Sequence, residues 1–279
     1  MIRIDRLSKS YGERVILREC SLEVRKGETL VVIGASGTGK STLLRTIIGL
    51  TAPDSGRVFV DGQEVNRLPR RDLQALRARM GYLFQTGALI NWLSVGANIA
   101  LPLVETRKLP DAEVEARVDR ALSLVGLAGT RDLSPGQLSG GMRKRVGLAR
   151  SLVTDPEIIL YDEPTTGLDP VTAHIIDQLI IDLRVKLGVT SVVVSHDMEG
   201  VYRVADRVAM LYDGRIIATG TPDEFRNSPD PIVQQFVTGA LEGPLADRVR
   251  QGAPPDAPRS LTMRRNIVLG GFVLTTLIG

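Results

Sequence analysis

The fold of this chain is decided by the stretch Gly34-Ala35-Ser36-Gly37-Thr38-Gly39-Lys40-Ser41-Thr42. It follows the apolar run 29–33, which predicts a buried strand, and precedes residues 43–50, which predict a helix that ends at a glycine. A strand, a glycine-rich loop and a helix in this order are the context of a phosphate-binding P-loop. The loop amides and the helix N-terminus would point at the phosphates. Lys40 would reach the β- and γ-phosphates, and the Ser41 hydroxyl would bind Mg²⁺.

The composition is that of a globular protein with a sizeable core. The chain has 279 residues, of which 43% are hydrophobic, and its 35 basic and 32 acidic residues leave a net charge of +3. This balance gives no indication of a nucleic-acid partner. Cys20 is the single cysteine, so no internal disulfide can form, and a reducing compartment is compatible with the sequence.

The remaining apolar runs predict an α/β fold with a largely parallel sheet. Runs at 81–84, 158–161 and 190–194 read as strands, and 171–187 reads as a long amphipathic helix between the last two. A hairpin is expected over 208–219. Near the N-terminus, residues 2–7 predict an edge strand, 15–17 and 22–24 predict two further strands, and 57–60 predicts a strand closed by an Asp-Gly turn.

Strand-like runs are absent between about residues 87 and 155, which predicts a helical insertion within a domain spanning 1–240. Asp111 is the expected N-cap of one of its helices, which stops at Gly126. Residues 241–262 read as a Pro/Gly/Arg-rich tail. Residues 263–279 are apolar after two arginines, but a helix over 267–278 would be about 18 Å long, short of the roughly 30 Å bilayer core. They are interpreted as a truncated membrane anchor or a fused reading frame, or alternatively as a packed or interfacial tail helix.

Polar residues follow three of the predicted strands. Asp162 suits Mg²⁺, and Glu163 would orient the water that attacks the γ-phosphate; alone, the pair could equally be a solvated loop. Gln85 could bind Mg²⁺ or that water, although a lone glutamine is usually polar surface. His196 could donate a hydrogen bond to the γ-phosphate, although such a histidine is often structural. Tyr11, in an early loop, could stack on a flat base or simply cap a hairpin.

A second anion site is expected at Ser139-Gly140-Gly141, where a hydroxyl and two glycines open a helix. One triphosphate rarely needs two such sites in one chain. Two facing chains would need them, because the P-loop of one and the Ser-Gly-Gly segment of the other could clamp the same nucleotide.

Together these motifs resemble the nucleotide-binding subunits of ABC transporters, in order and spacing, over about residues 1–240. The resemblance implies a P-loop NTPase fold with a RecA-like core, an antiparallel β subdomain and an inserted helical subdomain. It also implies a head-to-tail homodimer that holds two MgATP, and ATP hydrolysis. It assigns Tyr11 to adenine stacking, Gln85 to coupling, Glu163 to catalysis, Asp169 to contact across the dimer and His196 to sensing of the γ-phosphate. Met142 departs from the pattern, since many members carry glutamine there.

Three further segments resemble the ATPases of Mla/Mce lipid-transport systems; they are residues 84–89, 140–145 and 234–244. That resemblance implies two membrane permease subunits and an MCE-domain lipid-binding protein as partners, at the cytoplasmic face of the inner membrane. The segment from Leu89 to Val95, which holds the only tryptophan, is the expected permease contact, or alternatively a core turn of the insertion.

Alternative functions stay open. The same motifs serve ATPases that transport amino acids or other small solutes. A soluble ABC protein that acts on ribosomes or DNA usually carries two cassettes or a long coiled coil. A P-loop kinase leaves Ser139-Gly140-Gly141 without a role.

Overall fold

The computed structural model describes residues 1–106 and 109–245, and its centre is a six-stranded sheet in the order β10-β9-β3-β8-β7-β6. All neighbouring strands are parallel except β9 and β10, which form the predicted hairpin. The strands are β3 (Thr29–Ile33), β6 (Met80–Leu83), β7 (Ile158–Asp162), β8 (Thr190–Ser195), β9 (Arg207–Tyr212) and β10 (Arg215–Gly220). The predicted α/β fold with a largely parallel sheet is therefore confirmed.

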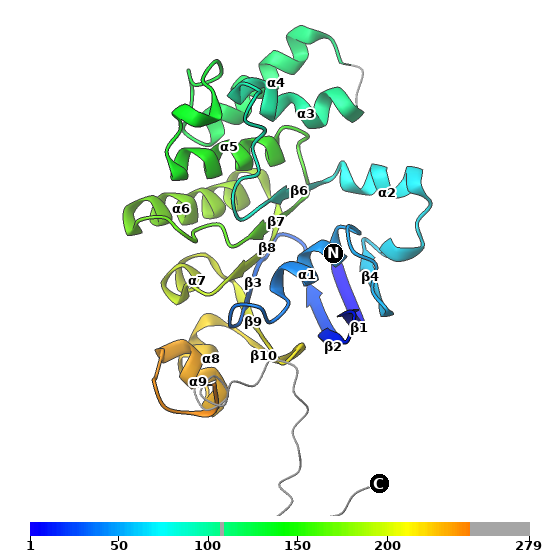
Figure 1. Cartoon of the computed structure of the whole chain (residues 1–279), viewed down its shortest axis with the longest axis vertical. Coiled ribbons are helices and arrows are strands. Elements are labelled where there is room, and N and C mark those ends of the chain that lie inside the picture. Colours follow the sequence, from blue (N-terminus) through cyan, green and yellow to red (C-terminus); the bar gives the residue numbers. More distant parts are fainter. Residues whose placement is uncertain (107–108, 246–279) are drawn as a thin grey trace, which may run out of the picture.

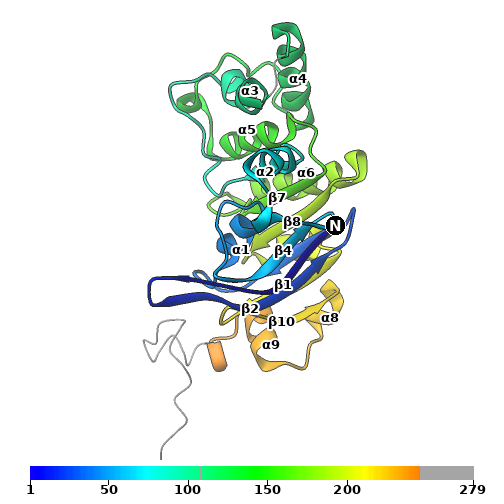
Figure 2. The ribbon, with the colours of Figure 1, turned by 90° about the vertical axis from the view of Figure 1, so that its right-hand side faces the viewer.

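A smaller antiparallel sheet lies beside α1, the P-loop helix (Lys40–Ile47), in the order β2-β1-β4-β5 (Figures 1 and 2). Its strands are β1 (Ile2–Tyr11), β2 (Arg14–Val24), β4 (Ser55–Val60) and β5 (Gln63–Glu64). Two expectations were wrong. β1 is an inner strand, and the two strands expected at 15–17 and 22–24 are one. The polar middle of β2 is an irregularity within the strand rather than a turn. There Glu19 takes a φ of 46°, and the register between β2 and β1 shifts.

The described residues between β6 and β7 contain helices and no strand, as predicted. They form α3 (Val95–Thr106), α4 (Asp111–Leu124), a short 3₁₀ turn η2 (Pro135–Gln137) and α5 (Gly140–Leu152). Figure 1 shows α3, α4 and α5 gathered at one end of the molecule. Pro110, rather than Asp111, takes the N-cap position of α4, and Asp111 lies in its first turn.

The other helices follow strands of either sheet or connect them, with η1 and α2 leading from β5 of the smaller sheet to β6 of the central one. They are η1 (Val65–Arg67), α2 (Arg70–Arg77), α6 (Pro170–Leu187), α7 (Met198–Val204), α8 (Pro222–Arg226) and α9 (Pro231–Thr238). Within the described ranges, no helix combines the length and apolar character that crossing a bilayer requires. The tail expected from 241 falls mostly outside these ranges, and so does the whole apolar segment 263–279.

The central sheet is buried on both faces, which explains why its strands are continuously apolar in sequence. Val31 and Ile33 of β3 face a core shared with α3, α4, α5 and α6, whereas Leu30 and Val32 face a core shared with α1 and the smaller sheet. The carboxyl ends of the parallel strands therefore open onto one edge of a rigid layer. The P-loop follows β3, Asp162 is the last residue of β7, and His196 follows β8, all at this edge.

Candidate functional site

The P-loop joins β3 to α1, and glycine is required at its end. Gly39 caps α1 with a φ of 104°, a conformation that side chains rarely adopt. A Cβ atom at this position would lie 2.8 Å from the Ile16 side chain of β2. The crest of the loop, Ala35-Ser36-Gly37, is exposed. Exposed backbone that leads into a helix N-terminus is suited to binding a polyanion.

Lys40 lies under this loop with its ammonium turned back toward the backbone. Its Nζ donates hydrogen bonds to the carbonyl oxygens of Gly34 (2.8 Å) and Ala35 (3.1 Å). The same atom is 3.2 Å from Glu163 Oε1, and both side chains are buried. Lys40 and Glu163, predicted from separate motifs, are thus in direct contact.

Asp162, at the end of β7, is held by two hydroxyl groups. Ser41 Oγ donates to its Oδ1 (2.7 Å), and the Tyr82 hydroxyl donates to its Oδ2 (3.0 Å). Burial, followed by the neighbouring Asp162 charge, raises the pKa of Tyr82. Sequence reasoning missed Tyr82 because an aromatic residue in an apolar strand is typical of a core. A hydroxyl and a carboxylate side by side form a donor set that suits Mg²⁺.

Glu163 follows Asp162 with a φ of 51°, a left-handed backbone that costs on the order of 1–2 kcal/mol outside glycine. Its Oε2 accepts a hydrogen bond from Thr166 Oγ1 (2.9 Å) and lies 2.7 Å from His196 Nδ1. Glu163, His196 and Lys40 are therefore clustered at the sheet edge, as predicted. Thr166 was not predicted, since a threonine in a polar loop carries no distinguishing pattern.

The segment at Ser139 is not brought to this cluster within the chain. Ser139 caps α5, and its Oγ accepts from the Met142 amide (3.2 Å), while Gly140 is exposed beside it. Asp169 caps α6 in the same way, through Thr172. Among the described residues, no hydrogen bond or ion pair joins Ser139, Gly140, Gly141 or Asp169 to the P-loop.

Tyr11 and Gln85 are both exposed. Tyr11 ends β1, where it pairs with Arg14 of β2, and Arg14 lies next to Gly37 of the P-loop. The hairpin end that carries Tyr11 therefore lies beside the loop, with half of the tyrosine accessible. Gln85 follows β6 and makes no hydrogen bond within residues 1–106 and 109–245.

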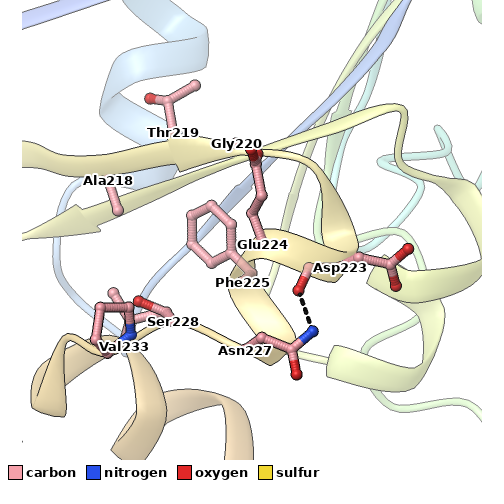
Figure 3. Close-up of a pocket in the computed structure, with 10 residues that line it drawn as sticks. Ala218, Thr219, Gly220, Asp223, Glu224, Phe225, Asn227, Ser228 and Val233 are labelled. Carbon is pink, nitrogen blue, oxygen red and sulfur yellow. Dashed lines mark hydrogen bonds between the residues drawn. The ribbon is translucent and has the colours of Figure 1, made fainter.

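A pocket of about 590 Å³ lies elsewhere, between β10, α8 and α9 (Figure 3). Its lining is mainly apolar and includes Phe225 and Val233, and a hydrogen bond from Asn227 to the Asp223 carbonyl joins two of its lining residues. None of the predicted site residues lines it. The chemistry lies at the sheet edge instead.

Comparisons with known proteins agree with the motifs. The sequence profile of the ABC transporter family matches residues 17–166. An intermembrane phospholipid transport system ATP-binding protein, MlaF of Haemophilus influenzae, is 42% identical over 88% of this chain and 93% of its own length. A probable ribonucleotide transport ATP-binding protein, mkl of Mycobacterium leprae, is 39% identical over 88% of this chain and 70% of its own length.

Among solved structures, the fold is similar to the dimeric ATP-binding cassette MJ0796 in a post-hydrolysis state with ADP and Pi. The TM-score is 0.74 at 34% identity, and the match covers 80% of this chain and 99% of that one.

Proposed function

The chain belongs to the ABC transporter family and is an ATPase, and on that premise we propose that it powers phospholipid transport through a membrane permease. The observation that carries the proposal is the 42% identity to a phospholipid-transport ATP-binding protein, which extends over nearly the whole length of that relative. The relative named for ribonucleotide transport supports a small-solute cargo as the alternative.

The contacts at the sheet edge support a division of labour in ATP hydrolysis. The P-loop, residues 34–42, would bind the phosphates, with Lys40 leaving its carbonyl partners for them. Ser41, Asp162 and the exposed amide of Gln85 would hold Mg²⁺, which neutralises phosphate charge when bound. Glu163 would orient and deprotonate the attacking water, and His196, already 2.7 Å from that carboxylate, would sense the γ-phosphate.

We further propose that two copies pair head to tail around two ATP molecules. Ser139 and Gly140 are exposed at the N-terminus of α5, with Gly141 buried behind them, and no hydrogen bond or ion pair within residues 1–106 and 109–245 joins them to the P-loop. In a head-to-tail pair they would complete the P-loop site of the other copy, with Asp169 at the contact between chains. The dimeric state of the solved relative supports this arrangement.

We propose that the permease contact is the segment from Leu89 to Val95, which leads into α3. Trp92 is 86% exposed at its tip, which is unusual for a large aromatic side chain. The loop is held from inside by the buried Asn98. Its Oδ1 accepts from the Ile90 amide (2.7 Å), and its Nδ2 donates to the carbonyl oxygens of Ile90, Leu93 and Ser94. A fixed loop that presents an aromatic anchor suits docking to a membrane subunit. In this proposal the ATPase lies at the cytoplasmic face of the inner membrane, and the permease connects it to an MCE-domain lipid-binding protein.

Purification of tagged Glu163→Gln protein from native membranes tests the function. With ATP present, blocked hydrolysis should preserve the closed assembly, and mass spectrometry should find a multispanning permease, an MCE-domain protein and enriched phospholipid. The same purification with ADP is the control. A permease with a solute-binding protein and no enriched lipid would contradict the lipid cargo, and absence of any membrane protein would contradict the transporter assignment.

A further inference from the structure

A buried lysine of α5 contacts the backbone of the Glu163 loop. Lys144 is only 5% exposed, although lysine is almost never buried without a partner. Its Nζ donates hydrogen bonds to the carbonyl oxygens of Glu163 (3.2 Å) and Thr166 (2.6 Å). These two carbonyls belong to the first and last residues of one turn, which a long backbone hydrogen bond from the Thr166 amide to the Glu163 carbonyl closes (3.4 Å) and which the single ammonium bridges.

This turn needs an external support. Glu163 has a left-handed backbone, which persists only where the surroundings determine it. The side chains of Lys40, Thr166 and His196 hold the carboxylate of Glu163, whereas its carbonyl group accepts a long hydrogen bond from the Thr166 amide (3.4 Å). Lys144 adds a shorter contact to this carbonyl (3.2 Å) from a different element, and its buried stem fixes the direction of approach.

We infer that Lys144 is a positioning residue for ATP hydrolysis, which fixes the backbone of Glu163 so that the carboxylate aims at the attacking water. The inference rests on the proposed catalytic role of Glu163. It also has a consequence for the dimer. Lys144 is on the helix that begins at Ser139, so displacement of α5 by a nucleotide bound between two copies would be transmitted to the Glu163 backbone.

The charge of Lys144 gives the pH dependence of kcat as a readout, which a purely structural lysine would not affect. Burial lowers the pKa of Lys144 to about 8, and the negative charge of Glu163 opposes this shift. Glu163 is the charged group that acts on this ammonium within the described residues, and Lys40 and His196 face the same carboxylate from α1 and from the loop after β8. Loss of the proton converts two charge-assisted hydrogen bonds into weaker neutral ones.

The test compares four variants of the full chain by steady-state ATPase kinetics between pH 6.5 and 9.5. Lys144→Met removes the donors and keeps the stem. Lys144→Arg keeps the donors and remains charged throughout. Lys186→Met removes an exposed lysine that, among the described residues, pairs with Asp182 on its own helix, and is the matched control. Glu163→Gln tests the underlying role of the glutamate.

We expect Lys144→Met to lower kcat by about 10-fold or more, with the KM for ATP within about twofold, because geometry rather than binding is lost. In the unmodified protein, kcat should fall as the pH rises through about 8. Lys144→Arg should keep most of the activity at pH 7 and lack this fall, whereas Lys186→Met should behave like the unmodified protein.

An unchanged kcat in Lys144→Met would overturn the inference, and so would an alkaline limb that persists in Lys144→Arg. If Lys144→Met does not fold, the pH profile of Lys144→Arg decides alone. Retained activity in Glu163→Gln would instead overturn the proposed role of the glutamate. An inactive Glu163→Gln beside a fully active Lys144→Met would refute only the role of Lys144.

Discussion

Tyr82 should affect the Mg²⁺ concentration that ATP hydrolysis requires, although its side chain is not proposed to contact the nucleotide. Its hydroxyl donates to Asp162 Oδ2 at 3.0 Å, while Ser41 occupies Oδ1. Tyr82→Phe removes one hydrogen bond to a buried carboxylate, which is worth about 1.5–3 kcal/mol. If the lost hydrogen bond lowers the free energy of unfolding by about 2 kcal/mol, the Tm of a domain of this size should fall by about 4–8 °C. Loss of a group that orients a metal ligand typically weakens metal binding by about 10–100-fold.

The assay is ATPase activity at fixed ATP against increasing Mg²⁺. Tyr82→Phe should raise the Mg²⁺ concentration for half-maximal rate by about 10-fold and recover most of the rate at saturation. Tyr202→Phe is the matched control, because the buried Tyr202 hydroxyl has no hydrogen-bond partner among the described residues. A Mg²⁺ dependence and a Tm equal to those of Tyr202→Phe would refute the assignment of Tyr82 as a support for Asp162.

Three other outcomes are expected. Lys40→Ala should weaken ATP binding by about 10-fold or more in a fluorescence titration, because a charge-assisted contact with phosphate is lost; an unchanged Kd would contradict its role. Trp92→Ala should reduce transport in reconstituted vesicles far more than it weakens ATP binding, and full transport would count against the permease contact. Burial lowers the pKa of Lys144 to about 8 in the folded protein. Above that pH the unfolded chain therefore binds more protons at this lysine than the folded chain does, so stability rises with pH. Urea melts should therefore show the unmodified protein gaining stability relative to Lys144→Met between pH 7 and 9.

The parts of the fold that the sequence predicted depend on local pattern. The apolar strand before Gly34 and the turn residues of the β9–β10 hairpin act over a few positions, so the sequence alone located them. The interior place of β1 did not follow, because strand order depends on which distant segment pairs with it, here β4. The continuity of β2 was missed since its polar middle, around Glu19, resembles a turn in sequence but is a register shift.

In the site, too, residues in local motifs were predicted and residues whose role depends on distant segments were not. Lys40, Asp162 and Glu163 belong to motifs whose spacing carries their chemistry, and contacts link them in the structure. Tyr82 could not be predicted, because its role depends on β6 lying beside β7, so that its hydroxyl reaches the end of the neighbouring strand. A role for Lys144 could not be predicted for a related reason. Its partners are backbone carbonyls, which every residue carries and no sequence pattern distinguishes.

Carbonyl partners recur along α5 and explain how one helix can serve two regions. Its cations donate to backbone oxygens: Arg143 to Leu138, Lys144 to Glu163 and Thr166, Arg145 to Val125 and Gly126, and Arg150 to Gly87 and Ala88. The Arg150 contacts hold the loop that begins at Gln85, on the side of the proposed permease contact. The Lys144 contacts hold the Glu163 turn, on the side of the proposed ATP site. Because one rigid helix carries both side chains, a force on the Gln85 loop cannot move α5 without pulling on the Glu163 backbone. Coupling between transport and hydrolysis then requires no direct contact between Gln85 and Glu163.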